Sequence, residues 1–258
     1  MKKTPYVYLW LIYAFLYAPI VVVIVYSFNK ARLSKDWRGF TWQWYESLFS
    51  NQPLIDSALN SLFLALCVAC LATFLGTLAA LCIHRYHFTG KRALQGSIYL
   101  LTISPDIVMG ISLLILFVSV NIPLGFVSLL LGHVTMAMPF VTVTVLARLD
   151  SFDENLIEAA RDLGASEAKS FLHVLLPLTM PGIAAGWLLS FTLSMDDVIL
   201  SVFLCGPGFE VLPLEMYSLV LRSQPSINAL STIMFLMTLL LILLAQFLAH
   251  PRKKAKKP

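Results

Sequence analysis

The sequence predicts an all-α integral membrane protein with six transmembrane helices, and three observations support this prediction. Hydrophobic residues make up 59% of the 258 residues and charged residues 12%, with a mean hydropathy of +0.82, whereas soluble domains carry about 25% charged residues. Apolar runs long enough to cross about 30 Å of hydrocarbon recur along the chain. The long charged stretch at residues 150–181, between two such runs, has the pattern of a helical hairpin. Residues 1–258 are therefore predicted to form a single transmembrane domain.

The first two predicted spans are identified by their length and by the charges that follow them. Residues 7–28 are uncharged. A start with Met-Lys-Lys is typical of a signal peptide, but this run is too long for a signal peptide core and lacks a small-x-small cleavage site. We interpret it as an uncleaved first span. The second span is expected at residues 57–83, and it is followed by Arg85, Lys91 and Arg92.

Four further spans follow from the next apolar runs. Between residues 93 and 147 the only Asp, Glu, Lys or Arg is Asp106. This run is too long for one span and contains the turn sequence NIPLG at 121–125, so we expect spans at 93–120 and 125–147. The fifth and sixth spans are expected at 183–204 and 229–249, separated by a loop that contains Pro and Gly.

The distribution of basic residues predicts the orientation. Of the 18 Lys and Arg residues, 13 lie on one side of the six-span arrangement, so the positive-inside rule places both termini and the 150–181 hairpin in the cytoplasm. Four of the other five collect in the first loop on the opposite side, so the orientation depends on the total. We interpret the basic C-terminal tail as a topology anchor at anionic lipid, not as a nucleic-acid site.

The first loop on the outer side also carries an aromatic cluster. Its members are Trp37, Trp42, Trp44 and Tyr45. Trp and Tyr are enriched at membrane interfaces. We therefore expect an interfacial helix or belt here rather than a ligand site.

The hairpin at 150–181 begins with an amphipathic helix. Ser151 and Glu154 have the spacing of a capping box. The residues that follow at helical spacing place an apolar face on this helix. That face consists of Leu156, Ala159, Ala160 and Leu163.

A glycine is expected to reverse the chain after this first helix. Gly164 can adopt the left-handed conformation that ends a helix. Ser166 is then in position to cap a second short helix, which leads to Val174 and Pro177. The segment should therefore form two helices joined by a tight turn.

The hairpin also carries a spaced motif. It has Glu158-Ala159-Ala160, then three residues, Gly164, nine residues, Val174, one residue and Leu176-Pro177. This motif resembles the EAA loop of binding-protein-dependent ABC importer permeases, which commonly have Ile where this chain has Val174. Composition alone is equally consistent with a hairpin that lies on the membrane surface, and the resemblance favours the EAA loop.

The resemblance implies a type I ABC importer permease fold in which the hairpin is the coupling helix segment that docks on a separate ATPase. The small side chains of Ala159 and Ala160 would allow a partner to approach closely. Charged neighbours would make polar contacts around them. The residues expected to couple the chain to the ATPase are Glu158, Ala159, Ala160, Arg161, Asp162, Gly164, Ala165 and Pro177.

Three acidic residues, Asp106, Asp196 and Asp197, fall inside predicted spans. Ionisable residues inside a bilayer are costly and mark a pathway or a buried pair. Asp106 and Asp196 are each about 13 residues from the cytoplasmic end of their span, roughly 20 Å deep, so they can share one layer. No Lys or Arg lies within a span. The acids are therefore protonated, or a partner subunit supplies a cation, or a passing substrate does, and the last option predicts a cationic substrate.

Each acid has a structural interpretation as well as a functional one. Asp197 continues a polar stripe with Ser190, Ser194 and Ser201 along one helix face. Asp196 points about 100° away, toward Thr192, where it could instead bond to a neighbouring helix. Asp106 follows Ser104-Pro105, so it could cap amides freed by a helix kink. The candidate pathway residues are Asp197, Asp106, Asp196, Ser190 and Ser194.

The amino-acid sequences of several segments are similar to those of the spermidine/putrescine permeases of the PotC type. These segments are LYAPIVVVIVYSFN, SPDIVMGISLL, EAARDLGAS and LSFTLSMDDVILS, and the similarity covers nearly the whole chain. The resemblance implies a bacterial inner-membrane importer of polyamines. It also implies a homologous second permease, an ATPase dimer that binds ATP and Mg, and a periplasmic binding protein, with no cofactor in this chain.

Other functions compete with this interpretation. A proton-coupled secondary transporter would use the three acids as proton carriers, but it usually has inverted repeats, of which the sequence has no clear trace. A membrane enzyme would need a metal or nucleophile constellation, whereas Cys67-x-x-Cys70 lacks a second ligand pair and His133 stands alone in its span. We interpret His133 as a bridge between helices. Gly90-Lys91 does not have the spacing of a P-loop. An ABC importer of another small solute stays an alternative, because the EAA loop indicates the ATPase partner and not the transported solute.

Overall fold

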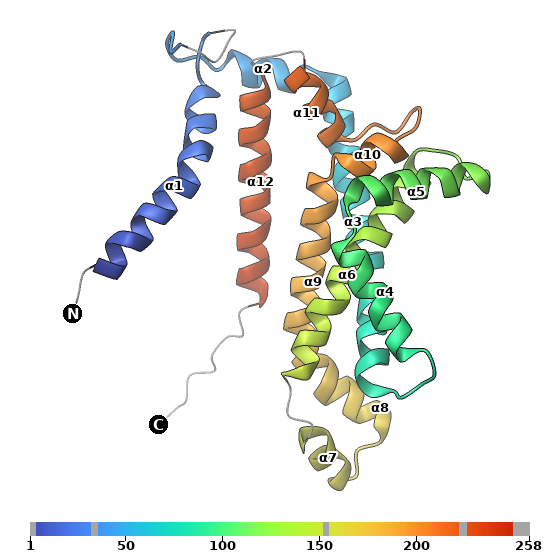
Figure 1. Ribbon diagram of the computed structural model, residues 1–258. Coiled ribbons are helices and arrows are strands. Elements are labelled where there is room, and N and C mark those ends of the chain that lie inside the picture. The colour runs from blue at the N-terminus through green and yellow to red at the C-terminus, as the bar shows by residue number, and fades with distance from the viewer. Residues whose placement is uncertain (1–3, 32–35, 152–154, 222–225, 250–258) are drawn as a thin grey trace.

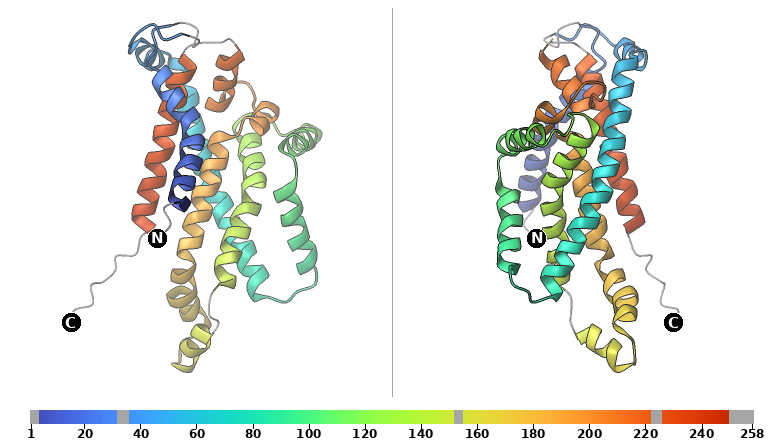
Figure 2. Two further views of the ribbon diagram at one scale, coloured as in Figure 1. Left: turned by 60° about the vertical axis from the view of Figure 1, so that its left-hand side comes forward. Right: turned by 90° about the vertical axis from the view of Figure 1, so that its right-hand side faces the viewer.

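The computed structural model describes residues 4–31, 36–151, 155–221 and 226–249. Within these residues the chain is helical, and the only β-pairing consists of two isolated bridges. Three long helices form the centre, namely α3 (Gln52–Arg85), α6 (Phe126–Asp150) and α9 (Leu176–Asp196). Figures 1 and 2 show them side by side, with α2 (Gln43–Phe49) and α11 (Leu212–Leu221) at one end and α7 (Asn155–Asp162) and α8 (Glu167–Ser170) at the other.

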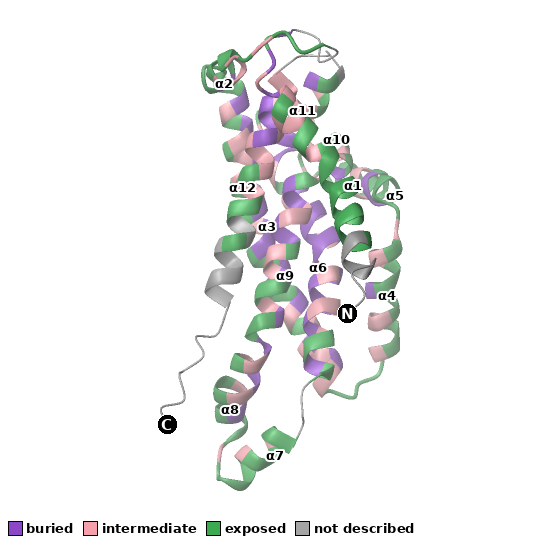
Figure 3. Cartoon of the chain, turned by 90° about the vertical axis from the view of Figure 1, so that its left-hand side faces the viewer, coloured by how far each residue is buried: buried purple, intermediate pink, exposed green. Residues whose placement is uncertain are grey.

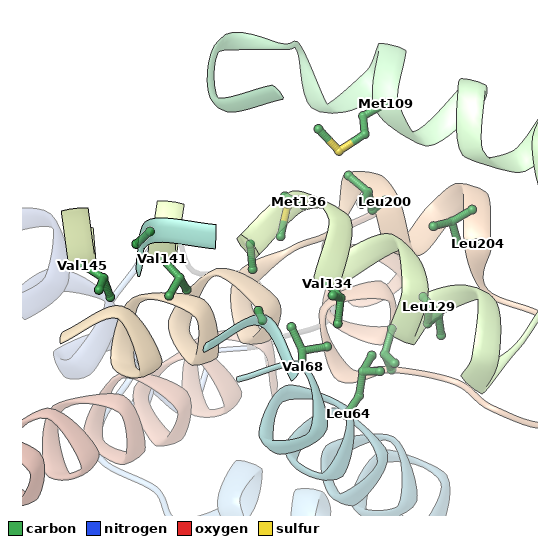
Figure 4. Packing of buried hydrophobic residues seen from close by; sticks show 14 of the residues in the cluster. Leu64, Val68, Met109, Leu129, Val134, Met136, Val141, Val145, Leu200 and Leu204 are labelled. Atoms are coloured by element: carbon green, nitrogen blue, oxygen red, sulfur yellow. The ribbon is translucent and has the colours of Figure 1, made fainter. Parts of the chain in front are cut away.

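The main hydrophobic core lies between the three central helices and continues to the short helix α10 (Ile199–Leu204). Figure 3 shows that the buried residues face inward along α3, α6 and α9, while their outer surfaces are exposed. The close view in Figure 4 shows Leu64 and Val68 of α3 beside Leu129 of α6, with Leu200 and Leu204 of α10 nearby. The outer surfaces are apolar too, as expected of helices that face lipid.

Glycines allow the central helices to approach closely. A Cβ atom on Gly76 of α3 would lie 2.8 Å from the Cβ of Val141, and one on Gly186 of α9 would lie 3.0 Å from its Cγ1. Val141 is fully buried. It therefore fills a space that exists only because both facing helices lack a side chain at this level, which is the common device of membrane helix packing.

Length and composition support four spans among the described residues, and a fifth if a bent pair of helices is counted as one span, so the predicted number of six stays a prediction. Within the described residues, four helical runs are long and apolar enough to cross a membrane: Tyr8–Tyr26, Gln52–Arg85, Phe126–Asp150 and Glu167–Asp196. The pair α4 (Lys91–Ile103) and α5 (Asp106–Ser119) passes only when its two helices are counted together. Helix α12 (Ser226–Ala249) contains a shorter apolar segment, Ser226–Leu240. Helix α1 (Thr4–Tyr26) stands apart from the core (Figure 1), and its membrane-length stretch Tyr8–Tyr26 is not buried.

The expected third span is not one continuous helix. It bends by 113° between α4 and α5. Pro105 explains the break, because it has no backbone N–H and forces the preceding residue out of the helical region, and Ser104 has an extended ψ of 135°. Helix α5 consequently lies across the direction of α6 and α9 (Figure 1). The bend comes just before Asp106, so it changes the course of the residues that follow Asp106 and leaves the straight stretch before it, over which its depth was estimated, intact.

The expected fifth span is also interrupted. Helix α9 ends at Asp196, and Asp197 has a non-helical backbone with ψ of 118° before α10 begins at Ile199. The segment that follows is more structured than expected, because α11 lies in what the sequence indicated as a loop. The aromatic loop contains a short helix, α2, and its position at a membrane interface stays a prediction.

Filling the glycine gaps should disrupt the bundle. We expect Gly76→Leu and Gly186→Leu to lower the amount of protein in the membrane and its Tm, since overpacking a core costs roughly 1–3 kcal/mol. The matched control is Gly96→Leu on α4, where an added Cβ meets nothing within 4 Å. Thermal unfolding in detergent measures the effect. Equal Tm values for all three variants would contradict the packing described here.

Candidate functional site

The hairpin after α6 reverses at Gly164, as predicted. Gly164 has a φ of +82°. Its amide donates to the Arg161 carbonyl over 2.8 Å, and the Ala165 amide donates to the Ala160 carbonyl over 3.0 Å. These bonds satisfy carbonyls that the end of α7 would otherwise leave free. The Ser166 hydroxyl accepts from the Lys169 amide at 3.4 Å, so the predicted cap of α8 is also confirmed.

The structure of the hairpin differs from the prediction in two details. The second helix is not separate, because α8 continues through a π-helical turn, Phe171–Leu175, directly into α9. Pro177 therefore lies in the first turn of α9, where its missing N–H is tolerated. The Ser151 hydroxyl bonds to the Arg148 carbonyl at the end of α6. Its predicted capping partner, Glu154, lies outside the described residues.

Helix α7 presents an uncovered apolar surface beside charged residues. Leu163 is 89% exposed and Leu156 is 48% exposed, and Ala159 lies between them on the same side. Of the predicted coupling residues, only Ala160 and Ala165 are half-buried. The exposed ones are Glu158, Ala159, Arg161, Asp162, Gly164 and Pro177. The hairpin thus has the composition of a docking surface.

Ion pairs connect the hairpin to the central bundle, and the sequence analysis did not find them. Glu167 accepts from Arg161 of α7 at 3.0 Å, and it also pairs with Arg85 at the end of α3 at 3.2 Å. Nearby, His84 lies 3.2 Å from Asp150 at the end of α6. Each pair has at least one largely exposed partner, so each contributes little to global stability. Of these pairs, Arg85–Glu167 is the one that joins the hairpin to α3.

A second candidate site lies where the chain breaks twice. Asp106, Asp196 and Asp197 line one cavity of about 470 Å³, as expected of acids in one layer. The breaks at Pro105 and Asp197 create this arrangement, because Asp106 opens α5 while the other two acids sit at the end of α9. The remaining lining is largely apolar, and consists of Met136, Phe140, Leu189, Thr192, Leu193, Val198 and Ile199.

Asp197 is held by a network of buried hydrogen bonds. Its Oδ2 lies 3.2 Å from Nε2 of His133 on α6 and accepts the Ser201 amide of α10 at 3.0 Å. The Nδ1 of His133 lies 3.1 Å from the hydroxyl of Ser194. The side chains of His133 and Asp197 are only 1% and 7% exposed. The expected role of His133 as a bridge between helices is confirmed.

The residues of the predicted polar stripe are arranged differently from the prediction. Because the helix is interrupted at Asp197, Ser201 bonds to Asp197 directly, and Ser194 is linked to it through His133. Ser190 is buried and bonds to the Trp187 carbonyl of its own helix. Neither Ser190 nor Ser194 lines the cavity of the three acids.

The other two acids are less constrained. Asp106 is exposed and lies in the first turn of α5, whose start has no side-chain cap, so the structure does not support the alternative in which Asp106 recaps amides freed by a kink. Asp196 lines the acid cavity and also a second cavity of about 470 Å³ between the end of α9, α11 and α12. Tyr217 and Phe235 contribute to that second cavity.

A protein family described as a binding-protein-dependent transport system inner membrane component matches residues 72–250 of this chain. The chain is 48% identical over 244 residues to the spermidine/putrescine transport system permease protein PotC of Haemophilus influenzae, covering 94% of this chain and 95% of that protein. It is 38% identical over 229 residues to the putrescine transport system permease protein PotI of Escherichia coli, with coverage of 86% and 82%.

Solved structures share the fold at lower identity. A chain of a bacterial ABC transporter involved in the import of the acidic polysaccharide alginate is similar with a TM-score of 0.69, 18% identity and 96% coverage of both chains. A chain of an amino acid ABC transporter is similar with a TM-score of 0.63 and 20% identity, covering 80% of this chain and 97% of that one. At these identities the likeness concerns the fold alone.

Proposed function

The chain belongs to the family of binding-protein-dependent transport system inner membrane components, and we propose that it is the permease subunit of an ATP-driven importer of the polyamines spermidine and putrescine. The observation that carries this proposal is the identity, over nearly the whole chain, with permeases named for these two compounds. The cavity with three carboxylates supports it. Polyamines are ammonium groups on methylene spacers, so they match carboxylates set among apolar side chains.

The exposed hairpin is proposed to dock on the ATPase. Its apolar residues and its EAA motif support this role, with Gly164 setting the turn. In this mechanism, ATP-driven closure of an ATPase dimer moves the hairpin as a rigid lever and opens the pathway outward, and hydrolysis resets it. ATP and Mg would be bound by the ATPase, and this chain would hold no cofactor.

The remaining partners follow from the same proposal. A homologous second permease would complete the pathway, and a periplasmic binding protein would deliver the polyamine. The hairpin and both termini would face the cytoplasm, as the positive-inside rule predicts.

Asp106, Asp196 and Asp197 are proposed to form a transient site along the pathway. Ser194 would contribute through its bond to His133. Ser190 would keep its helix in place, since its hydroxyl bonds within α9. The site should be weak, because a permease that held its cargo tightly could not release it.

Uptake measurements test the proposed function directly. In cells that lack this gene, restoring the chain should restore uptake of labelled spermidine and putrescine. That uptake should stop when ATP is depleted and persist when only the proton gradient is removed. Uptake that follows the proton gradient would favour a secondary transporter, and absence of polyamine uptake would show that the cargo is another solute.

A substitution of Gly164 should disturb the turn of the hairpin and so weaken its coupling to the ATPase. We expect Gly164→Val to reduce uptake at least fivefold while the protein still inserts, because a left-handed conformation costs a branched residue roughly 1–2 kcal/mol. Gly164→Asn is the matched control, since Asn tolerates this conformation and should retain most uptake. Uptake is compared at equal amounts of membrane-inserted protein. Normal uptake by the Val variant would count against the coupling role.

Removing the charge of Asp197 should impair transport without affecting assembly. We expect Asp197→Asn to lower polyamine uptake about tenfold, because an interaction with a charged group is worth on the order of 1.5–3 kcal/mol. The amount of ATPase that co-purifies with the chain should be unchanged. Normal uptake by this variant would remove Asp197 from the pathway.

A further inference from the structure

His133 is a buried titratable group to which the transport mechanism above gives no role of its own. It lies on α6 and reaches the two sides of the α9–α10 break, bonding Ser194 before the break and Asp197 within it. Both ring nitrogens have partners, and the side chain is almost completely excluded from solvent. The arrangement is therefore specific, since each atom able to donate or accept is used.

The donor and acceptor roles in this network follow from the proposed function. Because a cation is proposed to meet the ionised carboxylate of Asp197, which can only accept, Nε2 of His133 carries the hydrogen shared with Oδ2. With a neutral ring, Nδ1 accepts from the hydroxyl of Ser194.

This network leaves one oxygen of the Asp197 carboxylate, Oδ1, available to a ligand. The hydrogen bonds that Asp197 accepts through its side chain, within the described residues, all go to Oδ2. Asp197 also lines the cavity that contains Asp106 and Asp196. Two donors from different helices, His133 of α6 and the Ser201 amide of α10, fix the direction of the side chain at a point where the backbone is not helical.

We propose that His133 is the positioning residue for Asp197, which binds Oδ2 and thereby presents Oδ1 to an ammonium group of the cargo. This inference rests on the proposed polyamine transport and adds to it a residue that does not itself touch the cargo. A carboxylate with a fixed direction loses less freedom when the cation arrives. Without His133, Oδ2 of Asp197 would lose one of its two donors from different helices, and the side chain could adopt a different rotamer.

The test uses the complete transporter in proteoliposomes, with the second permease, the ATPase, the binding protein and labelled putrescine. The measured quantity is putrescine transported per ATP hydrolysed, because a loss of folded protein lowers both activities together and leaves this ratio unchanged. We expect His133→Leu to lower the ratio about tenfold, the size of one charge-assisted hydrogen bond. Thr142→Val is the control, since Thr142 is buried on the same helix and bonds only to the Met138 carbonyl.

Two conservative variants distinguish the roles of the two ring nitrogens. Gln is long enough to place an amide N–H where Nε2 lies, so His133→Gln should stay within about twofold of wild type. Asn reaches only the position of Nδ1, so His133→Asn should resemble His133→Leu. If His133→Leu fails to assemble, Ser194→Ala decides the question, because it removes only the partner of Nδ1 and should lower the ratio about threefold.

A double-mutant cycle tests whether His133 acts through Asp197. In the Asp197→Asn background, His133→Leu and Ser194→Ala should cause no further loss. Additive losses, equal impairment of the Gln and Asn variants, or a normal ratio in His133→Leu would each overturn the positioning role. A wild-type transporter that hydrolyses ATP but moves no putrescine or spermidine would instead overturn the proposed function.

Discussion

Val141 fills the space left by glycines on two neighbouring helices, and this contact sets how closely α3, α6 and α9 pack. The same helix, α6, determines what happens at both ends of the bundle. At one level its His133 binds the acid at the α9–α10 break. At the other, the Cβ of Arg148 packs where Gly182 of α9 has no side chain, and its Nε donates to the Leu178 carbonyl over 3.0 Å. Displacing α6 from the central contact would therefore disturb both candidate sites.

The acid cavity depends on backbone that has left the helix. A straight helix in a membrane satisfies all of its own amides and carbonyls, so an interruption requires substitutes. At the α9–α10 break, the carboxylate of Asp197 bonds the Ser201 amide, and its own carbonyl accepts the Ser201 hydroxyl. The group proposed to meet the cargo thus also stabilises the break that exposes it. Irregular backbone of this kind is tolerated where it lines a cavity.

Sequence patterns predicted the local features well and the long-range contacts poorly. Apolar runs located the long helices, and the Gly164 turn and the Ser166 cap follow from single-residue conformational preferences. The 113° bend was missed, because Pro105 is compatible with either a kink or a full break. The pairs His133–Asp197 and Arg85–Glu167 join residues far apart in the chain, so no local pattern could have matched them. The acids were correctly placed together, because the helices that lead to them are straight and are interrupted only where the acids lie.

One helical run connects the two candidate sites. It begins at Glu167, which pairs with Arg85, and passes through α8, the π-helical turn and α9 to Asp196 beside the acid cavity. Its 30 residues span about 45 Å at 1.5 Å per residue. Because a packed helix moves largely as a unit, a displacement of the hairpin must reach Asp196 unless the run bends, and the π-helical turn is the place where its hydrogen bonding is least regular. The proposed coupling between ATPase and cargo therefore needs no separate relay beyond the Gly164 turn, since the run that begins within the docking hairpin ends at the acids.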